Sequence, residues 1–169
     1  NEEKVYRKWE KSGVFAAPEA KMAKKRGQEP FCVIMPPPNA NDPMHVGHAM
    51  FVTIEDILVR YHRMKGDAVL WLPGTDHAGI ETQYVFEKKL AKEGKSRFDF
   101  SRSELYEMLW DYVQKNGQIA IEQMKRLGAS ADWGRYKFTL DKDIVELAQE
   151  TFIKLNKDGL IYRDEKLVN

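Results

Sequence analysis

The sequence of 169 residues predicts an α/β fold, the first half of a doubly wound parallel sheet with added helices. Two short apolar runs, 31–35 and 68–72, have the length of buried strands, and proline ends each of them. Each run is followed by a loop and then by a segment with apolar residues at helical spacing. This alternation predicts parallel strands joined by right-handed crossover connections.

The segment before the first strand predicts one helix and one loop. Residues 2–12 are expected to form a short helix with Trp9 on its apolar side, and Gly13 is expected to end it. Residues 16–30 are polar and basic, and we expect them to form a loop.

Four further helices are expected, over residues 46–65, 79–93, about 102–127 and about 141–158. Their apolar residues at helical spacing are Met50, Ile54, Ile57, Leu58, Tyr61 and Met64 in the first, Leu105, Met108, Leu109, Tyr112, Met124 and Leu127 in the third, and Ile144, Leu147, Ala148 and Leu155 in the fourth. Residues 160–163 then begin a new extended piece, shortly before the chain stops, so we expect the domain to be incomplete.

The composition indicates a soluble globular protein, with 43% hydrophobic and 31% charged residues. No apolar run is long enough to span a membrane, and the N-terminus lacks the features of a signal peptide. The single cysteine, Cys32, cannot form an intramolecular disulfide, which favours a reducing, cytoplasmic location. The formal net charge of +1 does not indicate a nucleic-acid surface, so we expect any RNA-binding surface to be local or to lie in parts outside this chain.

The first loop, residues 36–48, follows the first strand and is rich in proline and histidine. Ligands of open α/β sheets bind at the carboxyl ends of the strands, which makes this loop a candidate site. His45 and His48 stand at the start of the next helix, where two imidazoles can donate hydrogen bonds to phosphate oxygens. Gly47 has no side chain, so a flat or bulky group can approach its backbone. The loop therefore predicts displacement at phosphorus, assisted by positioning and electrostatics.

Other interpretations of the histidine pair stay open on the tetrapeptide alone. Two histidines three residues apart could bind a metal, but no third ligand is evident beside them, and we predict no metal site. They could also be ordinary polar residues at the start of a helix. Residues 45–48 have the pattern His-x-Gly-His, which small nucleotidylyltransferases carry, so these enzymes are one alternative.

The second loop, residues 72–83, follows the second strand and should face the first loop across the same crevice. Asp76 is its candidate functional residue, because a carboxylate can hold a substrate ammonium group by a charge-assisted hydrogen bond. An aspartate that caps the next helix is the structural alternative. His77 is expected to form a hydrogen bond within the loop and is not predicted to be catalytic.

Three segments resemble the class I aminoacyl-tRNA synthetases. His45-Val46-Gly47-His48 resembles their His-Ile-Gly-His signature, and Pro36-Pro37-Pro38-Asn39 before it is similar to the valyl branch. The segment 73–83 resembles the valyl Pro-Gly-Thr-Asp-His-Ala-Gly-Ile-Ala-Thr-Gln, whereas isoleucyl and leucyl members carry Gly-Trp-Asp. Residues 127–135 are similar to the Leu-Gly-x-Ser-x-Asp-Trp-x-Arg stretch of all three branches, where the tryptophan is expected to pack rather than to take part in chemistry.

The sequence departs from the valyl pattern at two places. Asn39-Ala40-Asn41-Asp42 stands where Asn-Val-Thr-Gly is usual, and Glu81 stands where alanine is usual. These departures leave an isoleucyl or leucyl type as an alternative within the class. The segment 21–25, Lys-Met-Ala-Lys-Lys, looks like the second signature of the class but precedes the first strand, so we expect a solvated basic loop there.

The resemblance implies a residue for each step of amino-acid activation. The two histidines of the family contact ATP and assist attack of the amino-acid carboxylate on the α-phosphate. The residues that match the family's positions are His45 and His48 as catalytic and ATP-binding groups, Gly47 under the adenine, Asp76 at the amino group of the amino acid, and Pro36 and Asn39 in the amino-acid pocket.

The resemblance also implies substrates and a domain organisation. ATP with Mg²⁺, L-valine and tRNA(Val) are the expected partners, the tRNA mainly through regions that the chain lacks, and no tightly bound cofactor or membrane is expected. Residues 1–30 would form an N-terminal helix and basic loop, and residues 31–169 the front half of the catalytic domain, ending where an editing insertion begins. A truncated relative that binds a nucleotide without turnover is the alternative.

Overall fold

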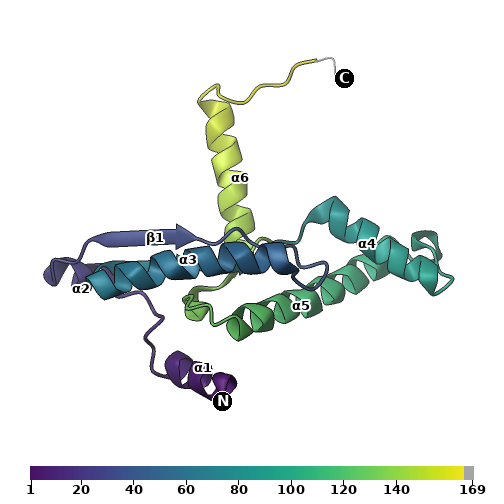
Figure 1. Cartoon of the computed structure of the whole chain (residues 1–169). Coiled ribbons are helices and arrows are strands. Elements are labelled where there is room, and N and C mark those ends of the chain that lie inside the picture. The colour runs from purple at the N-terminus through teal and green to yellow at the C-terminus, as the bar shows by residue number, and fades with distance from the viewer. Residues whose placement is uncertain (166–169) are drawn as a thin grey trace.

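The computed structural model describes residues 1–165 and confirms the α/β class (Figure 1). Its helices and strands in chain order are α1 (Glu2–Lys11), α2 (Ala20–Lys25), β1 (Pro30–Ile34), α3 (Val46–Lys65), β2 (Ala68–Leu72), β3 (Gly74–Thr75), α4 (Gly79–Lys92), α5 (Arg102–Arg126), β4 (Lys137–Phe138) and α6 (Lys142–Lys157), with short 3₁₀ turns at Arg97–Asp99 and Trp133–Arg135. The expected strands and longer helices are therefore confirmed to within one or two residues. Gly66 illustrates the reason for this agreement, because its φ of 96° ends α3 in a conformation that other residues rarely adopt.

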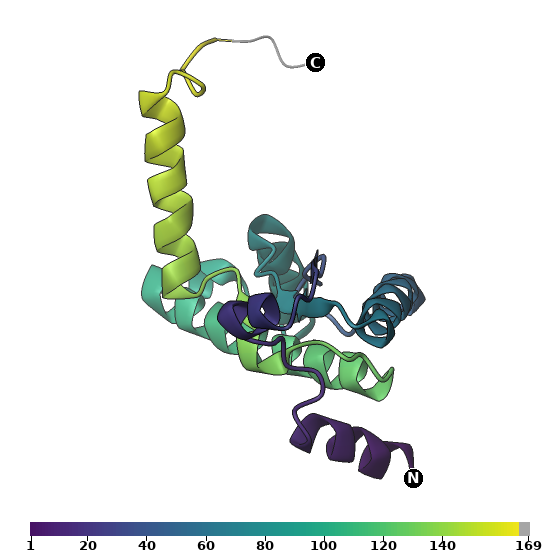
Figure 2. The ribbon, with the colours of Figure 1, turned by 90° about the vertical axis from the view of Figure 1, so that its left-hand side faces the viewer.

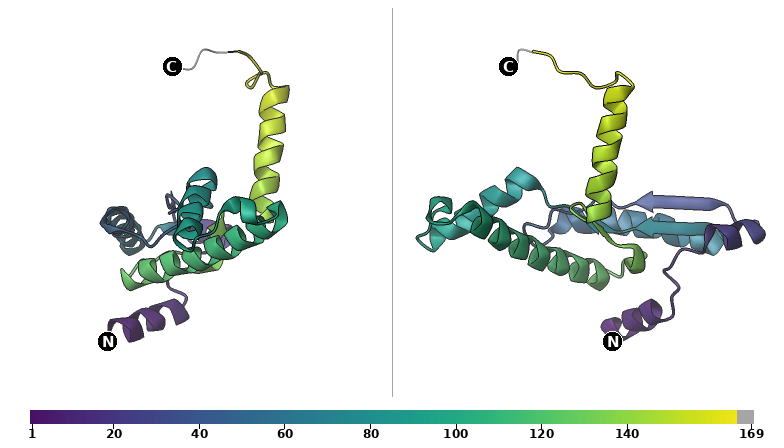
Figure 3. Two further views of the ribbon diagram at one scale, coloured as in Figure 1. Left: turned by 90° about the vertical axis from the view of Figure 1, so that its right-hand side faces the viewer. Right: turned by 180° about the vertical axis from the view of Figure 1, so that it is seen from behind.

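Three extended segments lie side by side in parallel, with residues 68–76 in the middle. On one side β1 pairs with β2 in the register Phe31–Val69 and Val33–Trp71, and Figure 3 shows the two strands from behind. On the other side β3 pairs with β4, a contact that the sequence did not predict because each strand has only two residues. The middle segment therefore receives hydrogen bonds from both neighbours as it approaches Asp76.

The hydrophobic core covers one face of this sheet. Val69 and Trp71 of β2 are buried against residues of α3 and α5, among them Val59 and Met124. The opposite face is open among the described residues, and Ile34 of β1 is 71% exposed there. The expectation that residues 31–35 form a fully buried strand is therefore wrong for the side chains on this second face, because no helix among residues 1–165 packs over it.

The apolar stripe expected on α3 does not face the core. All six of its members are exposed, and the buried residues of the helix are Val52 and Val59 instead. The stripe expected on α5 is also shifted, since the helix buries a different set, which contains polar and small residues: Val113, Asn116, Gly117, Ala120, Ile121 and Met124. Helical spacing predicted where the helices lie in the sequence, but it did not predict which face of each helix packs on the sheet.

The helix α1 lies next to the end of α5 (Figure 2). Tyr6, rather than Trp9, is its buried residue, and Trp9 is 40% exposed. The Tyr6 hydroxyl donates to the carbonyl of Ala129 at 2.8 Å and accepts from the indole N–H of Trp133 at 2.7 Å. The packing role expected for Trp133 is therefore confirmed.

Part of the segment 16–30 is helical rather than a loop, since α2 occupies Ala20–Lys25. Ala23 is the buried residue of this short helix, whereas Lys21, Lys24 and Lys25 are exposed. The segment that looks like the second synthetase signature is thus a solvated helical turn, and the expectation of a loop is wrong because one alanine packs inward.

The helix α6 projects away from the other elements (Figures 1 and 2), and none of its residues is buried. The expectation that its apolar residues face inward is therefore wrong within residues 1–165. The extended piece expected at 160–163 forms no strand there, and the match at 166–169 to the approach to an editing insertion lies outside the described residues. None of the helices in the described part is long and apolar enough to cross a membrane.

Candidate functional site

The two histidines of the first loop cap the N-terminus of α3. His45 is the N-cap residue, and its Nδ1 accepts a hydrogen bond from the backbone N–H of Gly47 at 3.0 Å. The backbone N–H of His45 in turn donates to Nδ1 of His48 at 3.2 Å. The two ring centroids are 4.1 Å apart. The first turn of α3 therefore brings the two rings together, as the sequence predicts.

These hydrogen bonds determine which ring nitrogen carries the proton. A neutral imidazole has one donor nitrogen and one acceptor nitrogen, and Nδ1 is the acceptor in both His45 and His48. The proton of each ring is therefore on Nε2, as assigned from the hydrogen-bond network. Both rings can donate from Nε2 to an anion at the mouth of the helix, where the helix dipole also favours negative charge.

Gly47 lets the His45 ring fold back over the helix start. A Cβ atom at Gly47 would lie 2.8 Å from Cε1 and 3.0 Å from Nδ1 of His45, so a larger residue would displace the ring. The space that the sequence assigns to a flat ligand is filled here by the His45 side chain. A ligand that stacks on Gly47 must therefore move this ring, which is exposed and held by one hydrogen bond.

The electrostatic environment favours the neutral form of His48. Partial burial lowers its pKa below the usual 6.5, and the neighbouring His45 lowers it further because two positive rings would repel each other. The neutral ring is also the form that accepts the hydrogen bond from the backbone of His45. His48 thus stays available as a neutral donor near pH 7.

The two loops meet through a short backbone ladder. The N–H of Ala40 donates to the carbonyl of Asp76 at 2.7 Å, and the N–H of Asp76 donates to the carbonyl of Pro38 at 2.9 Å. Asn39 and Asp76 are therefore paired directly, as in a parallel sheet. Two candidate residues of the amino-acid pocket are brought together by this ladder, whereas no hydrogen bond within residues 1–165 joins Asp76 to the histidine pair.

Two side chains of the helix α5 form hydrogen bonds with the backbone of the first loop. The Tyr112 hydroxyl donates to the carbonyl of Asn41 at 2.6 Å, and the Gln123 side chain accepts from the backbone N–H of Met44 at 2.8 Å. These contacts fix the path of the loop between the strand and α3. Pro36 stands at the start of the loop and is exposed.

Thr139 orients Asp76 from the opposite side. Its hydroxyl donates to Oδ1 of Asp76 at 2.8 Å. The same hydroxyl oxygen accepts from the backbone N–H of His77 at 3.0 Å and lies 2.7 Å from Nδ1 of that ring. A threonine hydroxyl has one hydrogen, and Asp76 receives it, so Nδ1 of His77 must be the donor in the second contact. Oδ1 of Asp76 is thus engaged by Thr139, and Oδ2 is the oxygen left for another donor.

The helix-cap interpretation of Asp76 is wrong. The helix α4 has Ala78 as its N-cap residue, with no side chain bonded to the exposed N–H groups of the helix start. The carboxylate of Asp76 binds Thr139 instead. The hydrogen bond expected for His77 within the loop is confirmed at its backbone carbonyl, which accepts from the Thr82 hydroxyl at 2.7 Å, whereas its ring contacts Thr139 outside the loop.

Asn39 has a second contact, from its side chain to the start of α4. Its amide Nδ2 donates to Oε2 of Glu81 at 2.9 Å. Glu81 is the third residue of the helix, is exposed, and is one of the two positions at which the sequence departs from the valyl pattern. The departure therefore lies beside the predicted amino-acid pocket.

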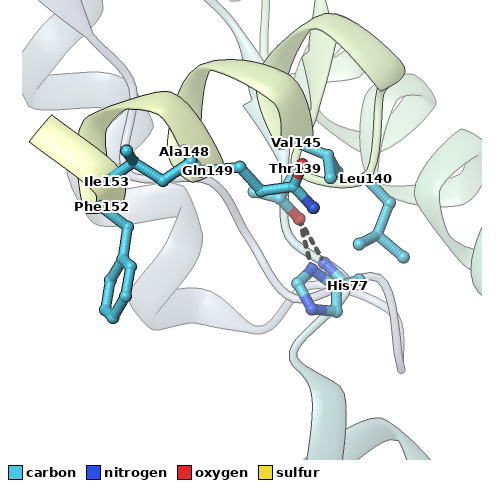
Figure 4. A pocket seen from close by; sticks show the side chains of 8 residues that line it. All are labelled: His77, Thr139, Leu140, Val145, Ala148, Gln149, Phe152 and Ile153. Carbon is cyan, nitrogen blue, oxygen red and sulfur yellow. Dashed lines mark hydrogen bonds between the residues drawn. The ribbon is translucent and has the colours of Figure 1, made fainter.

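A hollow of about 530 Å³ borders the Asp76 network (Figure 4). His77 and Thr139 form its polar end, and their hydrogen bonds are drawn there. Its apolar wall comes from α6 and the segment before it, through Leu140, Val145, Ala148, Phe152 and Ile153.

No group of three or more side chains suited to a metal ion occurs among residues 1–165.

The roles of Thr139 and of the contact of Glu81 with Asn39 were not predicted from the sequence. Thr139 comes 63 residues after Asp76, in a segment whose pairing with β3 spans only two residues. No spacing rule connects such distant positions. Glu81 differs from the alanine of the valyl pattern, and that departure is the one signal in the sequence that indicates its position in the site.

Comparison with known proteins supports a single family. Residues 4–169 match the family model for "tRNA synthetases class I (I, L, M and V)". The chain is 50% identical over its whole length to a chloroplastic/mitochondrial valine--tRNA ligase of Arabidopsis thaliana, and covers 17% of that protein. It is 45% identical to the valine--tRNA ligase of Treponema denticola and 46% identical to that of Geobacter sulfurreducens, with 99% of the chain and 18% of each relative covered. The chain thus spans about a sixth of the length of the curated relatives it matches.

The fold has a counterpart among solved structures. A crystal structure of the ternary complex of Agrobacterium radiobacter K84 LeuRS with tRNA and LeuAMS superposes with a TM-score of 0.74 at 22% identity, over 98% of this chain and 19% of that one. At this identity the likeness concerns the fold alone, and it confirms the predicted arrangement as part of a larger Rossmann-like α/β domain.

Proposed function

The chain belongs to the class I tRNA synthetases (I, L, M and V), and we propose that it is the front half of the catalytic domain of a valine--tRNA ligase. In this proposal the chain binds ATP and valine and promotes formation of valyl-adenylate. The full-length protein then transfers the valyl group to tRNA(Val), which it binds mainly through regions other than this chain. The identity of 44–50% to valine--tRNA ligases over nearly the whole chain supports valine rather than isoleucine or leucine.

The histidine pair would act on ATP. Attack of the valine carboxylate forms a bond from its oxygen to the α-phosphorus, and the bond from that phosphorus to the oxygen bridging the α- and β-phosphates breaks. Pyrophosphate leaves with the bond's electrons, and Mg²⁺ enters with ATP as part of the substrate. Nε2–H of His45 and of His48 can donate to phosphate oxygens as charge moves onto them. Such hydrogen bonds strengthen in the transition state and so accelerate the step.

Asp76 would hold the amino group of valine. Its carboxylate is fixed by the backbone ladder with the first loop and by Thr139, which leaves Oδ2 for the α-ammonium group. The observation that carries the proposal is the arrangement of these groups at the ends of two neighbouring strands. A carboxylate in a fixed orientation lies at the end of the middle strand, while two histidines stand at the helix start after the adjacent strand.

Exchange of labelled pyrophosphate into ATP tests the activity in the full-length protein. Exchange should depend on valine and be much weaker with isoleucine or leucine. Exchange that depends on isoleucine or leucine instead would refute the valine assignment and leave the class intact. Binding of ATP and valine without exchange would support the alternative of a relative that binds nucleotide without turnover. Exchange without any amino acid would refute both.

Replacement of Asp76 by asparagine tests the amino-acid half separately. The variant keeps the shape and removes the charge, so the α-ammonium loses a charge-assisted hydrogen bond worth roughly 1.5–3 kcal/mol. Valine affinity should fall about ten- to hundredfold, while ATP affinity, which depends on the first loop, should change little. Calorimetry of each ligand measures both values. An unchanged valine affinity in the folded variant would refute the assignment.

The cellular location of the protein stays a prediction. The relative from Arabidopsis thaliana is named for chloroplasts and mitochondria, whereas the sequence predicts a cytoplasmic location. Fractionation of cells that express the tagged full-length protein measures the location directly. Recovery in an organelle would refute the cytoplasmic prediction without affecting the proposed reaction.

A further inference from the structure

The contact between Asn39 and Glu81 constrains a side chain of the predicted amino-acid pocket. The backbone of Asn39 is already fixed, because the residues on either side of it form the ladder with Asp76. The remaining freedom of Asn39 is therefore the orientation of its amide. Glu81 holds this amide across the gap between the first loop and α4, at 2.9 Å.

The chemistry of the two groups determines which end of the amide faces Glu81. An ionised carboxylate accepts hydrogen bonds and cannot donate them, so the NH₂ group of Asn39 must point toward it. The amide oxygen Oδ1 consequently points away from Glu81. With alanine at position 81 neither orientation would be favoured by this contact, and the amide could turn over.

The orientation matters because the ammonium group of an amino acid is a donor only. It needs acceptors, and Oδ1 of Asp76 is already engaged by Thr139. An Asn39 amide that presents oxygen supplies a further acceptor beside the Asp76 backbone, whereas one that presents NH₂ repels the ammonium. Glu81 lies in the first turn of α4, so its position is set by the start of that helix.

We propose that Glu81 is a positioning residue for amino-acid binding, which holds the Asn39 amide so that its oxygen can accept a hydrogen bond from the α-ammonium of valine. The inference rests on the proposed function, because it assigns a role within the same site. It concerns a residue at which this chain departs from the valyl pattern.

Pyrophosphate exchange by the full-length protein tests the role, with Glu81→Ala, Glu81→Gln and the matched control Glu122→Ala. Glu122 is exposed on α5 and makes no ion pair within residues 1–165, so its variant removes the same charge elsewhere. The expected result for Glu81→Ala is a KM for valine about three- to tenfold higher, the effect of one hydrogen bond, with kcat and the KM for ATP unchanged. Glu81→Gln should lie between the wild type and Glu81→Ala, because a glutamine amide can accept the same hydrogen bond but can also turn over and donate to the oxygen of Asn39.

A double-mutant cycle with Asn39→Ala separates positioning from general electrostatics. If Glu81 acts through Asn39, Glu81→Ala should have no further effect on the KM for valine in the Asn39→Ala background. Additive effects, or a Glu81→Gln variant as impaired as Glu81→Ala, would overturn the positioning role. An active wild type with an unchanged Glu81→Ala variant would overturn this inference alone. A wild type without valine-dependent exchange would overturn the proposed function and this inference together.

Discussion

Replacement of Thr139 by valine removes one hydroxyl group and almost nothing else. The two side chains have nearly the same shape, so the packing beside β3 and β4 should persist. The variant deprives Oδ1 of Asp76 of its donor at 2.8 Å. It also deprives the backbone N–H and ring of His77 of the oxygen that accepts from them. The orientation of the Asp76 carboxylate would then depend on its backbone and on Nδ1 of His77, which lies 3.2 Å from Oδ1.

The size of the effect follows from the exposure of the groups involved. A hydrogen bond to a charged group contributes roughly 1.5–3 kcal/mol. The side chains of Asp76 and His77 are 33% and 39% exposed, so water can replace part of what the hydroxyl supplies. We therefore expect the lower end of the range, about 1.5 kcal/mol, which corresponds to roughly a tenfold loss of valine affinity.

Calorimetry of valine binding to the full-length protein measures this loss, and Thr139→Ser is the matched control. Serine keeps the hydroxyl and removes a methyl group, so its valine affinity should stay within about threefold of the wild type. ATP affinity should be unaffected in both variants. Equal losses of valine affinity in the valine and serine variants would refute the reasoning, because packing rather than the hydroxyl would then be responsible.

Three further outcomes follow from the loops. Gly74→Ala should weaken folding by about 1–3 kcal/mol in urea denaturation and lower valine affinity, because the added Cβ would lie 2.8 Å from the backbone carbonyl oxygen of Lys137 and force the two strands apart. A double replacement of His45 and His48 by alanine should depress the rate of pyrophosphate exchange far more than it weakens valine binding measured by calorimetry. The pKa of His48 is lowered in the folded state, so the unfolded chain binds its proton first as the pH falls; stability measured by urea denaturation should therefore decline below about pH 6.5, and less steeply in His48→Gln.

The elements that carry the site could be predicted from the sequence because local chemistry marks their ends. Proline ends both strands, and glycine follows the helices, so these boundaries depend on backbone conformations that few residues can adopt. The positions of His45, His48 and Asp76 after strand ends follow from the same signals. The histidine pair needs only one helical turn to meet, so its geometry was also accessible from spacing.

The packed faces and the distant contacts could not be predicted in this way. On α3 six apolar residues at helical spacing outnumber the two buried valines, and only the position of the sheet shows which set packs inward. The partners of Asp76 and Asn39 lie 63 and 42 residues away, and neither contact leaves a periodic pattern. A pairing of two residues on each side, as between β3 and β4, is likewise too short to be seen in the sequence.

The part of the site around Asp76 and the part around His45 differ in how rigidly their residues are held. Asp76 lies in an extended segment with hydrogen-bonded neighbours on both sides, so its position is set by backbone ladders that also hold Asn39 and the segment of Thr139. The His45 ring, by contrast, is exposed and rests over Gly47 through one hydrogen bond. A rigid amino-acid half fits the need to recognise one small ammonium group, because a misplaced acceptor there loses binding directly. An adaptable half fits the proposed role of the histidine pair, because a nucleotide that stacks on Gly47 would displace the His45 ring, whose Nε2–H could follow the phosphate.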